Sequence, residues 1–154
     1  MNVVKSYWED FRVGERVLMG SVKVTKEDIV RFAVEYDPQL FHIDEKAGES
    51  SIFGGLIASG WHTCSLVMKM MCDSYLLDSA SMGSPGMENI KWVKPVRPND
   101  VLTGFRTTIE TKSSRSKPDR GFVKTLFEVF NDSQELVMSM EGVGMFRRKN
   151  VNKK

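Results

Sequence analysis

The chain has 154 residues, of which 41% are hydrophobic and 27% are charged, and its formal net charge is +2. This length fits one globular domain with its own core, and the near-neutral charge argues against a nucleic-acid-binding protein. The mild excess of base gathers in a C-terminal tail, which we expect to be solvated and flexible from about residue 149; its basic residues are Arg147, Arg148, Lys149, Lys153 and Lys154.

The distribution of apolar residues and cysteines predicts a cytoplasmic protein. The first ten residues lack the apolar run of a signal peptide, and Lys69 and Asp73 interrupt the longest apolar segment, so we expect no membrane span. Cys64 and Cys72 have no metal-ligand spacing and fit free thiols in a reducing compartment. The two histidines and scattered carboxylates offer no convincing ligand set, so we expect no metal site.

The first predicted elements are a strand over residues 16–24 and a helix that follows it. Thr25 stands three residues before Asp28, a pattern similar to a capping box at a helix start. The next apolar residues recur at i, i+3, i+4 and i+7, which gives the helix one buried face: Ile29, Phe32, Ala33 and Tyr36. Pro38 should stop this helix at Asp37.

The segment from Asp37 to His42 is the strongest chemical signal in the chain. Because Pro38 disfavours helical backbone at Asp37, we expect a turn that brings the carboxylate and the imidazole together. Such a pair can hold a water molecule and move its proton near neutral pH. The alternatives are a histidine in a surface turn and an aspartate that ends a helix.

A second, central helix is predicted over residues 59–77, after a short helix or irregular link at 47–53 and a turn at Gly54-Gly55. Ser59 is well placed as its N-cap. Apolar side chains occupy most of its circumference, so we expect it to be buried on several sides.

The remainder of the chain has the pattern of β-strands. Strands are predicted at 87–93, 101–111, 122–130 and 136–146, with a polar hairpin loop at 113–120 and a turn at 131–132. These strands and one buried helix predict an α+β fold, a curved antiparallel sheet wrapped around a long central helix. Open sheet edges lead us to expect a homodimer or a higher oligomer built from dimers.

Three motifs resemble the MaoC-like dehydratases, relatives of the R-specific enoyl-CoA hydratases with the hot-dog fold. The first is Asp37 to His42, although Gln39 stands where the family usually has asparagine and Leu40 takes the place of its proline. The second is residues 53–63, which resemble the start of the family's central helix, and the third is residues 92–100. The similarity covers residues 8–148 and implies a single hot-dog domain spanning 1–154.

This resemblance implies an acyl-CoA hydratase or dehydratase that adds water reversibly to a trans-2-enoyl-CoA and gives an (R)-3-hydroxyacyl-CoA. Asp37 and His42 match the pair that activates water, and Gly60 matches the glycine whose N–H faces the thioester oxygen. Coenzyme A is then needed only as the carrier of the substrate, with no other cofactor. Candidate substrate-binding residues are Gln39, Ser59, Trp61 and His62.

Two other functions fit the same fold. An acyl-CoA thioesterase would need a carboxylate or a water-positioning residue on the central helix, where Asp73 is the only acidic residue and lies near the far end. A non-catalytic protein that binds acyl thioesters is the other alternative, because Gln39 and Leu40 depart from the family pattern. We expect His62 to be mainly structural and Asp44 to bond to local backbone.

Overall fold

The computed structural model describes residues 3–149 and 151 and has one antiparallel sheet of five strands. The strands lie in the order β1-β3-β4-β5-β2. Their bounds are β1 Arg16–Lys23, β2 Gly86–Trp92, β3 Val101–Ser113, β4 Arg120–Phe130 and β5 Leu136–Arg147. The predicted strands are therefore confirmed to within two residues. The period-two pattern of a strand is clearest along β4, where buried and half-buried positions alternate.

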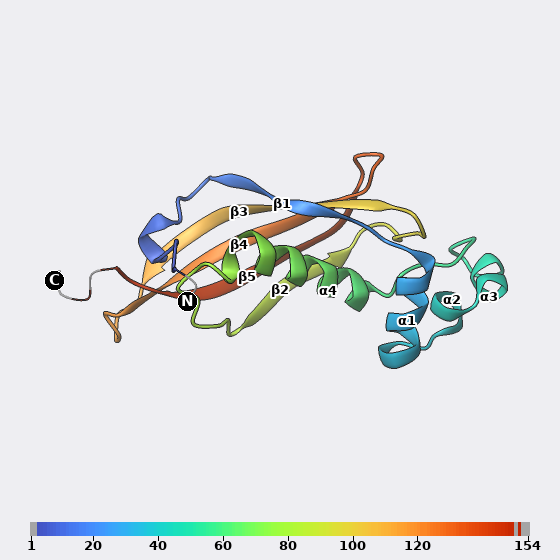
Figure 1. Cartoon of the computed structure of the whole chain (residues 1–154), viewed down its shortest axis with the longest axis horizontal. Coiled ribbons are helices and arrows are strands. Elements are labelled where there is room, and N and C mark those ends of the chain that lie inside the picture. Colours follow the sequence, from blue (N-terminus) through green and yellow to red (C-terminus); the bar gives the residue numbers. More distant parts are fainter. Residues whose placement is uncertain (1–2, 150, 152–154) are drawn as a thin grey trace.

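The central helix α4 (Gly60–Met71) lies along one face of this sheet (Figure 1). It continues into a π-helical turn, η2 (Cys72–Leu76), so the predicted helix over 59–77 is confirmed. Its buried side includes Val67 and Met70, which pack in the core with residues of β3, β4 and β5. Its other side is open in the single chain, since Trp61 is 56% and Met68 42% exposed. The expected burial on several sides is therefore wrong for one copy of the chain.

Three short helices gather at the end of the molecule where α4 begins (Figure 1). Helix α1 (Lys26–Tyr36) starts at Thr25, whose side chain accepts a hydrogen bond from the N–H of Asp28, as predicted. It ends at Asp37, directly before proline. The expectation of a purely non-helical turn up to His42 is wrong in part, because Leu40–Ile43 forms a single helical turn, α2.

Helix α3 (Glu45–Glu49) follows α2 and begins at Asp44. The Asp44 carboxylate accepts a hydrogen bond from the N–H of Ala47 at 2.8 Å, which confirms the local backbone contact expected for it. The short helix expected from residue 47 thus starts two residues earlier, because Asp44 provides the N-cap.

The C-terminal segment is held against the start of the chain. The short 3-10 helix η1 (Trp8–Asp10) supplies two carboxylates: Glu9 pairs with Arg148, and Asp10 with Lys149. Arg148 and Lys149 thus each have an anionic partner and stay partly exposed. That the tail is flexible from about residue 149 stays a prediction. The rest of the predicted tail, residues 150 and 152–154, lies outside the described residues.

Strands β1 and β2 form the two outer edges of the sheet within the described chain. Cys64 and Cys72 are both free and half-buried. Among the helices that the structure describes, none is long and apolar enough to cross a membrane.

Candidate active site

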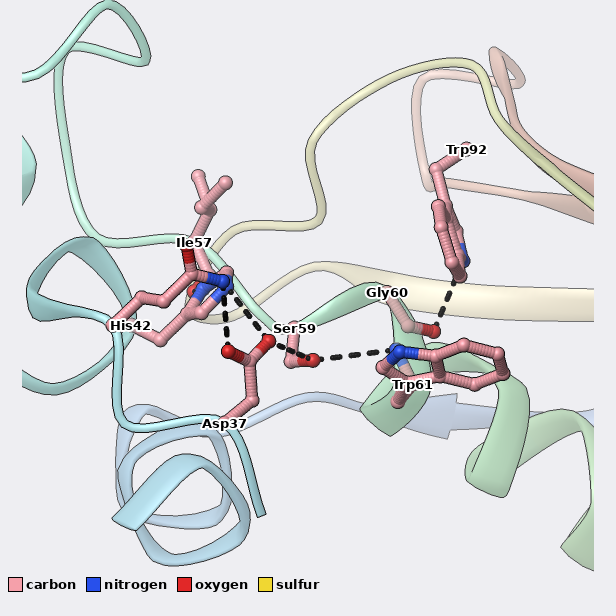
Figure 2. A network of polar contacts seen from close by, with 8 residues as sticks. Asp37, His42, Ile57, Ser59, Gly60, Trp61 and Trp92 are labelled. Carbon is pink, nitrogen blue, oxygen red and sulfur yellow. Dashed lines mark hydrogen bonds and ion pairs between the residues drawn. The ribbon is translucent and has the colours of Figure 1, made fainter.

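His42 is fixed by the loop that leads into α4. Its side chain is buried, and Nδ1 lies 2.7 Å from the carbonyl oxygen of Ile57. Because a carbonyl oxygen only accepts hydrogen bonds, Nδ1 must carry the proton. In the neutral imidazole, Nε2 then has a free lone pair, and this nitrogen lies 3.3 Å from Oδ2 of Asp37 (Figure 2).

Asp37 is held by two neutral donors. The hydroxyl of Ser59 donates to Oδ2 at 2.7 Å, and the amide of Gln39 donates to Oδ1 at 2.8 Å. Partial burial of Asp37 opposes ionisation, but these two hydrogen bonds, together with the charge of His42 when its ring is protonated, outweigh it and lower the pKa of the carboxyl. Asp37 is therefore ionised at neutral pH.

The two facing atoms of this pair are both acceptors when the imidazole is neutral. Oδ2 of Asp37 and Nε2 of His42 are near enough for one small molecule to reach both. A water molecule has two O–H groups and can donate one to each atom. The pair is thus complementary to a bound water, and it can take a proton from that water.

A cavity of about 490 Å³ opens beside the pair and extends to the N-terminus of α4. Its polar residues are few, and most of its wall is apolar or aromatic, as is common in sites for small molecules. The lining residues are Asp37, Gln39, Phe41, His42, Phe53, Ile57, Ala58, Gly60, Trp61, Thr63, Trp92, Val93, Lys94, Pro95, Val96 and Val137.

Gly60 is the first residue of α4 and lines this cavity. The first N–H groups of a helix have no partner inside the helix, and no described residue accepts a hydrogen bond from the N–H of Gly60. Ser59 is the N-cap as predicted, because its Oγ accepts from the N–H of Trp61 at 3.3 Å. A ligand oxygen in the cavity can therefore meet a free N–H at the positive end of the helix dipole.

The structure brings five of the predicted site residues to the cavity wall: Asp37, Gln39, His42, Gly60 and Trp61. Ser59 lies behind the wall, 1% exposed, where it joins Asp37 to the first turn of α4. Gln39 and Ser59 are thus seen as partners of Asp37. Their predicted contact with substrate stays a prediction.

His62 also lies outside the cavity wall. Its ring stacks on Phe32 of α1 at 4.9 Å, with 13° between the planes. Burial lowers the pKa of His62, an effect that Asp28 opposes and Arg31 reinforces. The ring is therefore neutral at pH 7 and has a structural place between α4 and α1.

Trp92 is the cavity residue to which sequence reasoning gave no role of its own. Its indole N–H donates to the carbonyl oxygen of Gly60 at 3.0 Å (Figure 2). Its ring also packs edge-on against Trp61, with 5.4 Å between centroids. The cavity residues Phe41 and Phe53 were missed as well, because Phe41 comes from α2 and Phe53 from the loop after α3. Among the described residues, no group of three His, Cys, Asp or Glu side chains could hold a metal ion.

A second, smaller cavity of about 160 Å³ lies at the other end of α4. Its wall is mainly apolar and is made by α4, η2, β2, β4, β5 and the loop before β2. The lining residues are Met68, Met71, Tyr75, Leu76, Ser81, Gly83, Ser84, Met87, Val123, Thr125, Phe127, Gly142, Val143, Gly144 and Phe146.

Comparison with known proteins agrees with this architecture. A family model described as a MaoC like domain matches residues 10–128. The chain is 29% identical over 133 residues to the uncharacterized protein YdeM of Bacillus subtilis strain 168, covering 86% of this chain and 93% of that protein. The crystal structure of a MaoC-like dehydratase from Rhodospirillum rubrum superimposes with a TM-score of 0.86 at 36% identity, covering 95% of this chain and all of that one. The unliganded R-hydratase PhaJ1 from Pseudomonas aeruginosa shares the fold, with a TM-score of 0.74 at 19% identity over 93% of this chain and 86% of that one.

A five-stranded antiparallel sheet with one long helix along its face, together with these neighbours, defines a hot-dog domain. The chain belongs to the MaoC-like domain family. This membership supports an enzyme of the hydratase and dehydratase class, and it confirms both the predicted family and the predicted α+β fold.

Proposed function

We propose that the chain catalyses the reversible addition of water to a trans-2-enoyl-CoA, giving an (R)-3-hydroxyacyl-CoA. One observation carries this proposal: Oδ2 of Asp37 and Nε2 of His42, two acceptors 3.3 Å apart, belong to residues that line the same cavity as Gly60, whose N–H has no described acceptor. Hydration of an enoyl thioester needs a base for water at one point and a donor for the thioester oxygen at another.

The Asp37–His42 pair acts on the water. The water donates its two O–H groups to Oδ2 and Nε2, which turns an oxygen lone pair toward C3 of the substrate. As the new C3–O bond forms, one O–H bond breaks and its proton passes to the pair. The π electrons of the double bond move toward the thioester, and C2 then takes a proton back from the same pair. Both additions occur on one face, so the addition is syn.

The N–H of Gly60 acts on the thioester oxygen. Negative charge collects on that oxygen when the enolate-like intermediate forms, and a fixed N–H at a helix N-terminus stabilises this charge more than it stabilises the neutral substrate. One donor of this type contributes roughly 10²–10³-fold to kcat in comparable oxyanion sites. The reaction uses water and a thioester alone, so we propose no cofactor beyond the coenzyme A that carries the acyl group.

The two alternative functions receive less support from the site. A thioesterase would use a carboxylate or a water-positioning residue on the central helix. The only acidic candidate there, Asp73, lies in η2 beyond the end of α4 and pairs with Lys69. The alternative of a non-catalytic binding protein was based on Gln39 and Leu40, which depart from the family pattern. The amide of Gln39, however, donates a hydrogen bond to Asp37 and so stabilises the ionised carboxylate that catalysis needs.

The test is an assay of the purified chain with trans-2-enoyl-CoA substrates of several acyl lengths. We expect loss of the enoyl absorbance without release of free thiol. Thiol release would identify a thioesterase, and binding without turnover would identify a binding protein. We expect Asp37→Asn to lower kcat by roughly 10²–10⁴-fold, because the amide presents an N–H where the water needs an acceptor.

Asp44→Asn is the matched control for this variant. It makes the same change of one carboxylate to an amide seven residues away, and asparagine caps helices as well as aspartate does. We expect its kcat to equal that of the wild type. Equal rates for the two variants would remove Asp37 from the mechanism.

We also propose that two copies associate through β2 and the open side of α4. The outer edge of β2 has no neighbouring strand among the described residues, and the exposed Trp61, Met68 and Trp92 lie on or next to this side. Sedimentation equilibrium should show a dimer or a multiple of it. A monomer at micromolar concentration would contradict this assembly.

A further inference from the structure

The contact between Trp92 and Gly60 restrains the first residue of α4. Trp92 donates its indole N–H to the Gly60 carbonyl oxygen, and a Cβ added to Gly60 would overlap with the indole ring. The ring therefore occupies the space beside the Gly60 Cα, and it also packs edge-to-face with Trp61. Glycine is the residue with the greatest backbone freedom, so a contact from outside the helix adds to the restraint on its orientation.

A bulge in β2 is what turns Trp92 toward α4. Glu88 is paired with Glu141, but Lys91 is paired with Ser139, so β2 has one residue more than β5 over this stretch. Asn89 has a positive φ of 52° within the bulge. In a regular strand, residues five apart point to opposite faces.

The extra residue changes that alternation. Met87 faces α4 and lines the apolar cavity, and Trp92, five residues later, also faces α4. Bulges commonly redirect a side chain near a site. The amide of Asn89 donates to Glu141 of β5 at 2.6 Å, which holds the bulge in place.

We propose that Trp92 is a positioning residue for the proposed hydration: by holding Gly60, it keeps the Gly60 N–H aimed at the place where the thioester oxygen gains charge. This inference rests on the proposed function of the site. Trp92 acts through the backbone of Gly60 and takes no proton. Trp92 also lines the same cavity as Gly60.

A second tryptophan provides a matched control within the same chain. The indole N–H of Trp8 donates to the carbonyl oxygen of Phe122 at 3.1 Å, and its ring lies where a Cβ on Gly121 would be. The chemistry of the contact is thus the same, one tryptophan over one glycine, but Trp8 lies outside the residues that line the larger cavity. If Trp92 had only a structural role, its substitution and that of Trp8 should have the same effect on kcat.

The experiment compares Trp92→Phe with Trp8→Phe. Each variant loses one N–H donor and keeps an aromatic ring. For Trp92→Phe we expect kcat with an enoyl-CoA to fall roughly fivefold to tenfold, the effect of losing one anchoring hydrogen bond. The Kd of the corresponding saturated acyl-CoA should change less than twofold, because no charge develops on its oxygen. Trp8→Phe should lower Tm to a similar extent and leave kcat unchanged.

Equal kcat values for the two variants, with turnover in the wild type, would overturn the role of Trp92 and leave the proposed function standing. No turnover of any enoyl-CoA by the wild type would overturn the proposed function and this role with it.

A double variant gives a further check. Trp92→Leu removes the ring that overlaps with a Cβ at residue 60, so Gly60→Ala/Trp92→Leu should have a higher kcat than Gly60→Ala alone. Purely additive losses would contradict the positioning role.

Discussion

The two ends of α4 face cavities whose walls are both mainly apolar but which differ in their charged and hydrogen-bonding groups. At the N-terminal end, the larger cavity contains an ionised carboxylate, a buried imidazole and an unpaired N–H. At the C-terminal end, the smaller cavity is bounded by methionine, aromatic and glycine residues, among them Met71, Gly142 and Phe146. One helix thus joins a cavity that contains an aspartate and a histidine to a cavity with no Asp, Glu, Lys, Arg or His side chain in its wall.

The polarity of the helix backbone explains this division. Free N–H groups point out of the first turn, so only the N-terminal end can stabilise negative charge that develops on a ligand. The last turn has carbonyl oxygens instead, and here it continues into the π-turn η2. That end can contribute packing and shape, which suits the hydrocarbon part of an acyl chain.

The largest expected effect separates the two histidines. His42→Ala should lower kcat by roughly 10²–10⁴-fold, because Nε2 is one of the two acceptors for water. His62→Ala removes an equally buried ring from the same helix cluster, but that ring stacks on Phe32 away from the cavity. We expect its kcat to stay within about threefold of wild type when both are measured well below their Tm. A comparable loss in both variants would indicate a general structural effect.

A second comparison substitutes one glycine in the cavity at each end of α4. In Gly60→Ala the new Cβ overlaps with the rigid Trp92 indole, so the first turn of α4 must shift, and kcat should fall roughly 10²-fold. In Gly142→Ala the new Cβ meets the end of the flexible Met87 side chain, which can move aside. We therefore expect a small change in kcat for Gly142→Ala. Steady-state kinetics with a short enoyl-CoA measures both.

Met68 allows the link between the two ends to be tested. It lines the apolar cavity and lies seven residues after Trp61, about 10 Å along the helix. If the acyl chain extends from the thioester toward that cavity, Met68→Ala should raise kcat/KM for long enoyl chains relative to short ones by roughly threefold to tenfold. An unchanged chain-length profile would show that the acyl chain takes another path.

The smallest expected effect concerns stability. Because burial lowers the pKa of His62 below 6.5, the folded protein binds fewer protons there than the unfolded chain does. This group therefore contributes stability that is complete above about pH 6.5 and is lost as the pH falls toward the lowered pKa. His62→Gln should show a smaller drop in Tm between pH 7.5 and 5.5 than the wild type. Parallel Tm curves would contradict the lowered pKa.

Local sequence signals predicted the polar end of α4 well. Proline after Asp37 ended α1 where expected, and the five-residue spacing to His42 placed both side chains at one cavity. Ser59 caps α4 as its position suggested. These features depend on neighbours in the chain, and the resemblance to a known family added the role of Gly60.

Features that depend on the sheet register were not predicted. The bulge at Asn89 arises from pairing between β2 and β5, and it decides the face on which Trp92 lies. A signal was present, since the helix-facing residues Met87, Ile90 and Trp92 are spaced by three and then two, which breaks strict alternation. The ion pairs that fix Arg148 join residues far apart in the sequence, so no local pattern indicated them.

A crystal structure of the Asp37→Asn variant with a trans-2-enoyl-CoA bound would test the central claim most directly, because the variant should retain its substrate. We predict the thioester oxygen within hydrogen-bond distance of the Gly60 N–H, and C3 next to a water molecule on Nε2 of His42. A thioester bound away from the start of α4, or a double bond remote from His42, would contradict the account.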